Sequence, residues 1–82
     1  MTIQEATVQR IKELCLEQEI TGYKLTNRID TPPSTVKSII SGKSKNPGIH
    51  NIYKIAAGLE VSIPDFFGSE LFNNLDDESE ES

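Results

Sequence analysis

Apolar residues recur every three or four positions along most of the chain, and this spacing predicts amphipathic helices. Thr2 and Glu5 have the spacing of a capping box, in which a hydroxyl and a carboxylate satisfy free backbone N–H groups at a helix start. We therefore predict a first helix from Ile3 to about Gln18. Its buried face would consist of Val8, Ile11, Leu14 and Cys15.

A second, shorter helix is predicted from about Gly22 to Ile29, with Thr21 as its N-cap. Leu25 and Ile29 are four residues apart, so both would face the core. We expect Asp30 to end this helix in the left-handed conformation, because aspartate tolerates that conformation better than most residues do.

The third predicted helix begins near Pro32 or Pro33, because proline suits a first helical turn, where its missing N–H is not needed. It runs to about Ser41, and Gly42 is the expected C-cap. Its apolar side would consist of Val36, Ile39 and Ile40.

Two further helices are predicted beyond a polar loop that ends in Asn46, Pro47 and Gly48. The first of them spans about 49–59, and Ser62 would cap a final short helix in which Phe66 or Phe67 closes the core. The buried stripe predicted for 49–59 consists of Ile49, Ile52, Ile55, Ala56 and Leu59. With no strand pattern in the sequence, the expected fold class is all-α, a compact five-helix bundle.

Charge divides the chain into a basic part and an acidic part. All eight basic residues lie in 1–54, which hold five acidic residues, whereas 55–82 hold eight acidic residues and no basic one. The net charge of −5 therefore conceals a basic centre. We predict one domain over 1–73 and an acidic, disordered tail over 74–82, whose composition offers too little apolar surface to fold.

Composition argues against several classes of protein. One cysteine and one histidine cannot form an intramolecular disulfide or a structural zinc site. The sequence shows no signal peptide and no apolar run of the ~20 residues that span a membrane, so a cytoplasmic protein is expected. It also offers no carboxylate pair, activated nucleophile or phosphate loop, so we expect neither an enzyme nor a cofactor.

The segment 22–41 carries the candidate function. Its two helices would pack through their apolar faces and leave the outer face of the second one free. A helix of about nine residues is ~14 Å long and fits a DNA major groove ~12 Å wide. Small hydroxyl groups permit close approach to base edges, and a lysine can reach guanine acceptors. The candidate base contacts are Pro33, Ser34, Lys37, Ser38 and Ser41.

From about Arg10 to Phe67 the sequence resembles the phage-repressor, or XRE, type of helix-turn-helix domain. The resemblance rests on the order and spacing of six short pieces, which are 10–14, 34–39, 41–43, 46–47, 52–56 and 59–62. It implies a lambda-repressor-like fold of five helices whose third helix, about 33–41, is the recognition helix. It also implies a transcriptional regulator, mostly a repressor in this family, that binds paired half-sites as a dimer.

Five positions depart from the family pattern. Gly22 stands where a glutamine often anchors phosphate, and Thr26 stands where alanine is usual. Asp30 replaces the usual turn glycine, and Glu19 replaces a common glycine or asparagine. Ile40 stands where an acid often pairs with an arginine of the first helix. The change at Gly22 is the most serious, because it leaves only a backbone N–H for phosphate.

The remaining expectations concern partners. The partners are double-stranded DNA, a second copy of the chain and, through the acidic tail, a possible second protein. The bound protein would lie on the nucleoid. An alternative is an interaction module or antitoxin component whose DNA binding is weak or depends on a partner. The candidate phosphate contacts are Gly22, Tyr23, Lys24, Arg28, Lys43, Lys45, Asn51 and Lys54.

Overall fold

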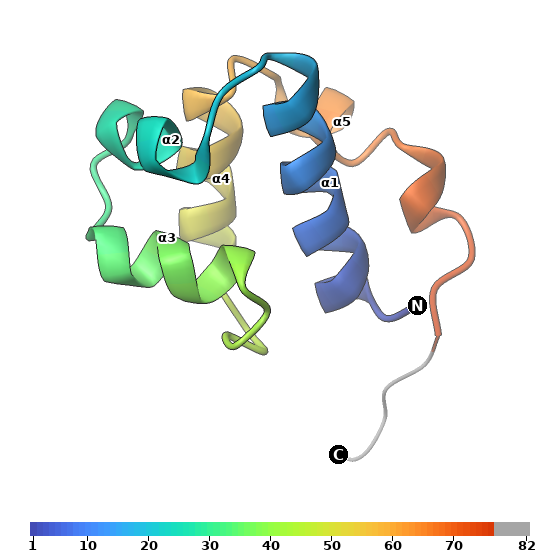
Figure 1. Cartoon of the computed structure of the whole chain (residues 1–82). Helices are drawn as coiled ribbons and strands as arrows, with labels where there is room; N and C mark the ends of the chain where they lie inside the picture. Colours follow the sequence, from blue (N-terminus) through green and yellow to red (C-terminus); the bar gives the residue numbers. More distant parts are fainter. Residues whose placement is uncertain (77–82) are drawn as a thin grey trace.

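Six helical segments follow one another along residues 1–76, the part of the chain that the structure, a computed structural model, describes (Figure 1). No strand occurs in this part, which confirms the predicted all-α class. The segments are α1 (Ile3–Glu17), α2 (Gly22–Arg28), α3 (Pro33–Ile40), α4 (Ile49–Gly58), α5 (Ile63–Phe66) and the 3₁₀ helix η1 (Glu70–Phe72). The short η1 was not predicted.

Side-chain caps fix three of the five predicted helix starts, those of α1, α2 and α5. The Thr2 hydroxyl accepts a hydrogen bond from the backbone N–H of Glu5 at 3.2 Å, and the Glu5 carboxylate accepts one from the N–H of Thr2 at 2.9 Å. Thr21 and Ser62 cap α2 and α5 in the same way through one N–H each. These bonds are local in sequence, which explains why the starts could be predicted.

The turn between α2 and α3 differs from the prediction. The left-handed conformation predicted for Asp30 is wrong, because Glu19 and Glu60 are the only described non-glycine residues with a positive φ. Ile29 is extended instead, with φ −124° and ψ 156°, and so is Pro32, with φ −53° and ψ 135°. A residue before proline is driven toward extended backbone, so the two prolines build this turn without a left-handed residue.

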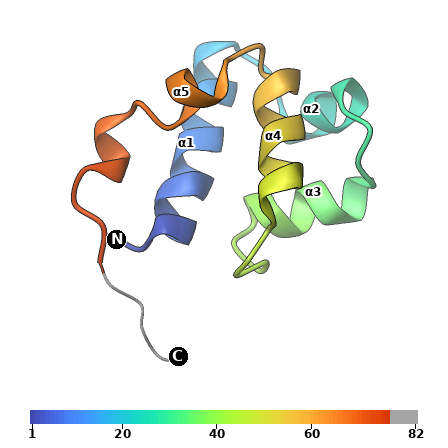
Figure 2. The same cartoon turned by 180° about the vertical axis from the view of Figure 1, so that it is seen from behind.

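Each of the five α-helices contributes side chains to the hydrophobic core. Figures 1 and 2 show α2 and α3 stacked on one side of the molecule, and α3 also contacts α1. Cys15, Ile29, Ile40 and Phe67 pack against the core from partly buried positions. The core cluster consists of Ile11, Leu14, Leu25, Val36, Ile39, Ile52, Ile55, Ala56, Leu59 and Phe66. This confirms most of the predicted stripes, including closure by Phe66.

One predicted core residue lies on the surface. Ile49 is 85% exposed, so its place in the buried stripe of α4 was wrong. Its spacing from Ile52 is correct, but Ile49 is the first residue of the helix, directly after Gly48. A partner helix, α2, packs near Gly58 at the opposite end, so the first turn projects beyond the core.

Gly58 allows α2 and α4 to approach closely. A β-carbon at this position would overlap the side chain of Ile29, and it would lie 3.4 Å from Leu25 Cδ1. Glycine lowers helix propensity by about 1 kcal/mol relative to alanine. The close packing of Ile29 on the α4 backbone explains why the helix contains this unfavourable residue.

Arg10 connects α1 to α5. Its guanidinium donates to the carbonyls of Phe66 and Asp65, both at 2.8 Å, and forms an ion pair with Glu13 at 2.7 Å. The carbonyls at the end of a short helix lack helical partners, so a cation there satisfies them. Arg10 therefore has hydrogen-bond partners although Ile40 stands where an acid often pairs with the first-helix arginine.

The C-terminal part of the described chain returns to α1. The Phe67 ring lies with its centroid 4.9 Å from that of Phe66 and 5.0 Å from that of Phe72. Further on, the N–H of Asp76 donates to the Met1 carbonyl at 2.9 Å, and its carboxylate pairs with the Met1 amino group at 2.8 Å. The tail predicted over 74–82 thus begins with residues that are described, whereas 77–82 lie outside the described residues.

Thr31 provides a test of the α2–α3 turn. Its hydroxyl is the one buried side-chain polar atom among the described residues that has no hydrogen-bond partner. Valine has the same shape without the hydroxyl, so we expect Thr31→Val to raise the free energy of unfolding by about 1 kcal/mol. Urea denaturation followed by circular dichroism would measure this change.

The matched control for this prediction is Thr7→Val. Thr7 is also buried, but its hydroxyl donates to the Ile3 carbonyl at 2.7 Å. This variant is therefore expected to lose stability or leave it unchanged. Equal effects of the two substitutions would contradict the assignment of an unsatisfied hydroxyl to Thr31.

Candidate nucleic-acid interface

The outer face of α3 carries small and basic side chains. Pro33, Ser34, Lys37 and Ser41 are exposed, and Ser38 is half-buried. Val36 and Ile39, on the opposite side of the helix, are buried in the core. The packing of α3 thus leaves the predicted set of side chains outward, four of them fully at the surface.

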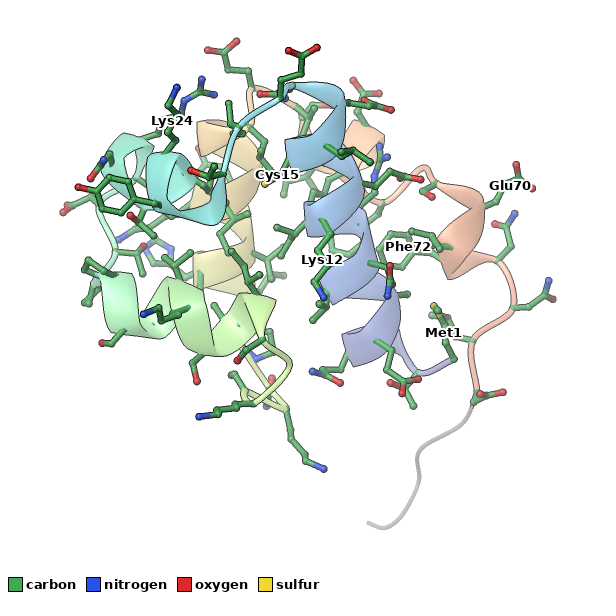
Figure 3. All side chains as sticks on the ribbon, viewed as in Figure 1. Met1, Lys12, Cys15, Lys24, Glu70 and Phe72 are labelled. Carbon is green, nitrogen blue, oxygen red and sulfur yellow. The ribbon has the colours of Figure 1, made fainter. Side chains whose placement is uncertain are left out.

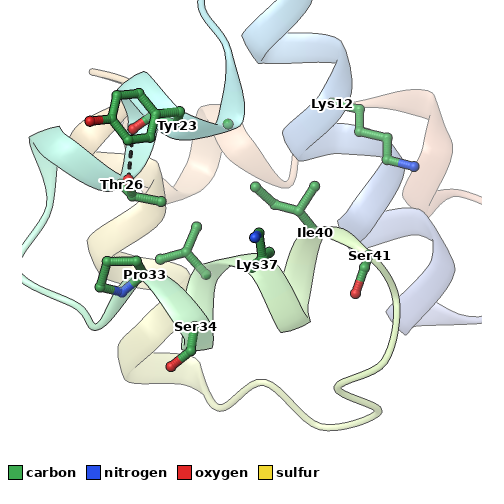
Figure 4. Close-up of a pocket in the computed structure, with 10 residues that line it drawn as sticks. Lys12, Tyr23, Thr26, Pro33, Ser34, Lys37, Ile40 and Ser41 are labelled. Atoms are coloured by element: carbon green, nitrogen blue, oxygen red, sulfur yellow. Dashed lines mark hydrogen bonds between the residues drawn. The ribbon is translucent and has the colours of Figure 1, made fainter.

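A groove lies between this face and the neighbouring helices α1 and α2 (Figure 4). It has a volume of about 780 Å³, and Val36 and Ile40 contribute apolar side chains to its lining. Figure 4 shows Tyr23 and Thr26 of α2 on one side of the groove and Pro33 and Lys37 of α3 on the other. The groove therefore runs along the flank of α3 that faces α2.

Lys12 also lines this groove, and the sequence analysis did not select it. Its side chain projects from α1 and is labelled in Figures 3 and 4. The contact between α1 and α3 places this lysine near Ser41, at the end of α3. The pairing of those two helices cannot be inferred from local spacing, and the only sequence signal for Lys12 was its position next to the buried Ile11.

The start of α2 brings Gly22 and Tyr23 alongside α3, whereas the predicted phosphate contact Lys24 projects from the side of α2 away from α3 (Figure 3). The Thr21 hydroxyl already accepts the N–H of Lys24 at 3.1 Å, and Tyr23 is 76% exposed. A β-carbon at Gly22 would lie 3.5 Å from Ile40 Cδ1, an ordinary van der Waals contact. The space at this position therefore accepts a β-carbon, although the sequence supplies none.

The loop after α3 holds two exposed lysines, Lys43 and Lys45. Gly42 allows the sharp exit from α3 with a φ of 84°, and the N–H of Lys43 donates back to the Ser38 carbonyl at 3.1 Å. The Gln4 side-chain amide donates to the carbonyls of Gly42 at 3.2 Å and Ser44 at 3.3 Å. The start of α1 thus holds this loop in place beyond the end of α3.

Three predicted phosphate contacts form hydrogen bonds within the protein. Arg28 donates to the Gly58 carbonyl at 3.3 Å, and Lys54 donates to the Asp30 carbonyl at 2.9 Å. Asn51 donates to the Pro47 carbonyl at 2.8 Å. These bonds connect α2, α4 and the adjoining loops. Each of the three side chains would have to give up its bond within the protein in order to contact a phosphate.

The structure therefore brings together two of the predicted groups around α3. One group, Gly22 and Tyr23 at the start of α2, lies along its flank, and the other, Lys43 and Lys45 in the loop, lies beyond its C-terminal end. From Thr21 to Lys54 the sequence holds six basic residues and one acidic residue. Two short helices joined by a tight turn, with basic residues around the exposed face of the second, are typical of the class of helix-turn-helix DNA-binding domains.

Comparison with known proteins identifies the family. The sequence model of a helix-turn-helix family matches residues 11–66, which is more than half of the chain. The chain belongs to this family of DNA-binding transcription regulators, and its resemblance to the XRE type is confirmed. No curated protein and no solved structure matches it. Within residues 1–76, every helix is too short or too polar to cross a membrane.

Proposed function

We propose that the protein is a sequence-specific transcriptional repressor that inserts α3 into the major groove of DNA. The observation that supports this most strongly is the outward face of α3. In the described part of the chain, its small hydroxyl groups and Lys37 form no hydrogen bond to another helix, and the Ser41 hydroxyl donates only to the Ser38 carbonyl, at 3.1 Å. Small side chains allow the helix to approach base edges closely. The proposed base contacts are Pro33, Ser34, Lys37, Ser38 and Ser41.

Phosphate contacts would fix the orientation of α3 in the groove. Gly22 and Tyr23 lie along its flank, Lys43 and Lys45 lie beyond its end, and the side chain of Lys24 would reach phosphate from the other side of α2. Such contacts carry no sequence information, but they set the register of the protein on the duplex. The two groups would hold the DNA backbone on either side of the base-reading side chains.

A homodimer on DNA is part of this proposal. A helix of eight residues is ~12 Å long and reads only a few base pairs, too few for a unique site in a genome. Two copies on half-sites about one helical turn apart would double the sequence that is read. We infer that the protein acts in the cytoplasm, on the nucleoid, where the DNA that carries its half-sites lies.

The test is selection of genomic DNA fragments by the full-length protein, followed by sequencing and by affinity measurements over a salt series. We expect a short site, in the form of two related half-sites about 10 base pairs apart. The logarithm of the affinity should fall with the logarithm of salt concentration with a slope of roughly −3 to −8. Absence of any binding at low salt would contradict the proposal.

A second candidate function is an interaction module whose DNA binding depends on another protein, such as an antitoxin. The observation in its favour is the apolar groove beside α3, in which Gly22 supplies no side chain for phosphate. A groove of this kind can receive an apolar side chain of a partner. This candidate predicts that DNA binding is absent for the isolated chain and appears on addition of a protein that co-purifies with it.

Gly22→Gln tests the phosphate site at the start of α2. The structure leaves room for a β-carbon at this position, and a side-chain amide there can donate a hydrogen bond to a phosphate oxygen. We expect the variant to bind its selected site about threefold to tenfold more tightly, a gain of about 1 kcal/mol. Fluorescence anisotropy would measure the affinity. Gly22→Ala is the control, because it adds the β-carbon without a donor, and equal gains for both variants would contradict this role.

A further inference from the structure

The groove beside α3 continues into a smaller hollow between α1 and the start of α2. The groove has a volume of about 780 Å³, and the hollow has a volume of about 240 Å³. Lys12, Gly22 and Ile40 line both of them, so the two spaces adjoin. Leu16 and Ile20 add apolar side chains to the lining of the hollow. Together the two spaces form a long apolar surface that extends from α3 to α1.

The side of this surface that α2 provides is also largely apolar. Gly22 has no side chain, and a β-carbon there would lie 3.5 Å from Ile40 Cδ1. Thr26, one turn further along α2, is half-buried, and its hydroxyl donates to the Tyr23 carbonyl at 2.6 Å. The hydroxyl hydrogen of Thr26 is therefore already bound, so the contacts that a ligand would make here are mainly apolar.

Two lysines and no acidic residue line the groove. Lys12 and Lys37 are both exposed, and in the view of Figure 4 the Ile40 side chain lies between them. Neither lysine forms an ion pair within residues 1–76. An anionic group at this place would therefore meet two cations and no like charge among the residues that line the groove.

These features together indicate the chemistry of a ligand. A volume of this size falls in the range of small-molecule sites, and a long apolar surface fits a hydrocarbon chain. The ammonium groups are carried on flexible four-carbon stems, which can both turn toward one anion. We propose that the groove binds a free, linear medium-chain alkyl carboxylate, with its chain along Gly22 and Ile40 and its carboxylate at Lys12 and Lys37.

A bound carboxylate would compete with DNA for the outer face of α3. Four of the proposed base contacts also line the groove, namely Pro33, Ser34, Lys37 and Ser41. The ligand would neutralise Lys37 and occupy the flank of the helix that has to enter the major groove. This consequence for regulation rests on the proposed function, whereas the binding site itself does not.

Titration of the full-length protein with octanoate, followed in ¹H–¹⁵N NMR spectra, tests the site without DNA. The backbone amide signals of 22–26 and 37–41 should shift until the site is saturated, whereas those of 63–66 in α5 should not. Decanoate should bind about fourfold more tightly, because each of its two further CH₂ groups, when half buried, contributes about a factor of two. Absence of saturable shifts at 22–26 and 37–41, or equal affinities for the two chain lengths, would overturn the site.

A probe with the same chain and the opposite charge tests the role of the lysines. Octylammonium should bind about tenfold more weakly than octanoate, because its cation is repelled by Lys12 and Lys37. Added salt should reduce this difference, since it screens exposed charges. Equal affinities for the two probes would overturn the proposal and would leave an apolar groove of the kind that a side chain of a protein partner fills.

Lys12→Gln tests the contribution of α1 to the site. We expect the variant to bind octanoate about threefold more weakly and to bind octan-1-ol with unchanged affinity, because only the carboxylate uses the ammonium group. Lys45→Gln is the matched control, since it makes the same change of charge at an exposed position outside the groove. It should leave octanoate binding unchanged. Equal losses of octanoate affinity for both variants, or a parallel loss of octan-1-ol affinity in Lys12→Gln, would overturn the contact.

Measurements with DNA separate the site from the proposed function. Octanoate at ten times its dissociation constant should lower the apparent affinity for the selected DNA site about tenfold, and octylammonium at the same concentration should not. Octanoate binding by a chain that binds no DNA would retain the site and reject the proposed function. Octanoate binding with unchanged DNA affinity would overturn the competition.

Discussion

Replacing Lys37 by glutamate is expected to weaken binding to the selected DNA site about 100-fold, or about 2.7 kcal/mol. Lys37 is exposed on the outer face of α3, and its side chain lines the groove between α2 and α3 (Figure 4). The substitution removes a donor to base acceptors and places a carboxylate near the DNA. Both effects act in the same direction, because like charges brought together across an interface are destabilising. Fluorescence anisotropy with the selected site would measure the loss.

Lys45→Glu is the matched control, since it makes the same change of charge in the loop beyond α3. It should weaken binding to all sequences and leave the preferred site unchanged, as expected for a phosphate contact. Lys37→Glu should also alter the preferred base at one position when DNA selection is repeated. A change of less than twofold in affinity for Lys37→Glu would contradict the placement of α3 in the groove. Circular dichroism of both variants would confirm that the helices are retained.

Phe66→Ala is expected to have the largest effect on stability, a loss of about 3–5 kcal/mol in the free energy of unfolding. Phe66 has no exposed surface, and its ring lies 4.9 Å from Phe67 and 6.4 Å from Phe72 between centroids. Its removal leaves a cavity at the point where α5 closes the core. Because a domain of this size is only marginally stable, most of its stability would be lost. Urea denaturation would give the change directly.

Phe67→Ala is the comparison for this prediction. Phe67 is only half-buried, so the cavity left by its removal is partly open to water and the expected loss is about half as large. Both variants leave the outer face of α3 intact. A loss of less than 1 kcal/mol for Phe66→Ala would show that α5 does not close the core in solution.

The helices could be predicted because their ends depend on neighbouring residues. Thr2, Thr21 and Ser62 form caps with residues three positions later, and Pro33 begins α3 by its own geometry. The outward face of α3 followed from the spacing of Val36 and Ile39. Family resemblance supplied the functional interpretation of that face, and the match over 11–66 confirms the family.

The remaining features depend on contacts between distant segments. Lys12 joins the groove only because α1 packs against α3, and Arg10 finds two of its three partners in α5, more than 50 residues away. Ile49 has the right spacing for burial, but no helix of residues 1–76 covers its side chain in the first turn of α4. The bonds from Gln4 to the loop likewise connect positions about 40 residues apart. Periodicity gives the direction of a side chain, and tertiary packing decides what lies there.

The single cysteine, Cys15, offers a chemical probe of the surface beside α3. Cys15 is half-buried in a hollow beside Ile20 and Ile40, and burial raises the pKa of its thiol, against a smaller lowering effect of Arg28. A protonated, shielded thiol reacts slowly with alkylating reagents. Partial burial shields the thiol further, so the rate of its modification depends on access to this hollow. Gly22 and Ile40 line both this hollow and the groove beside α3, so a ligand in the groove is expected to slow the modification of Cys15.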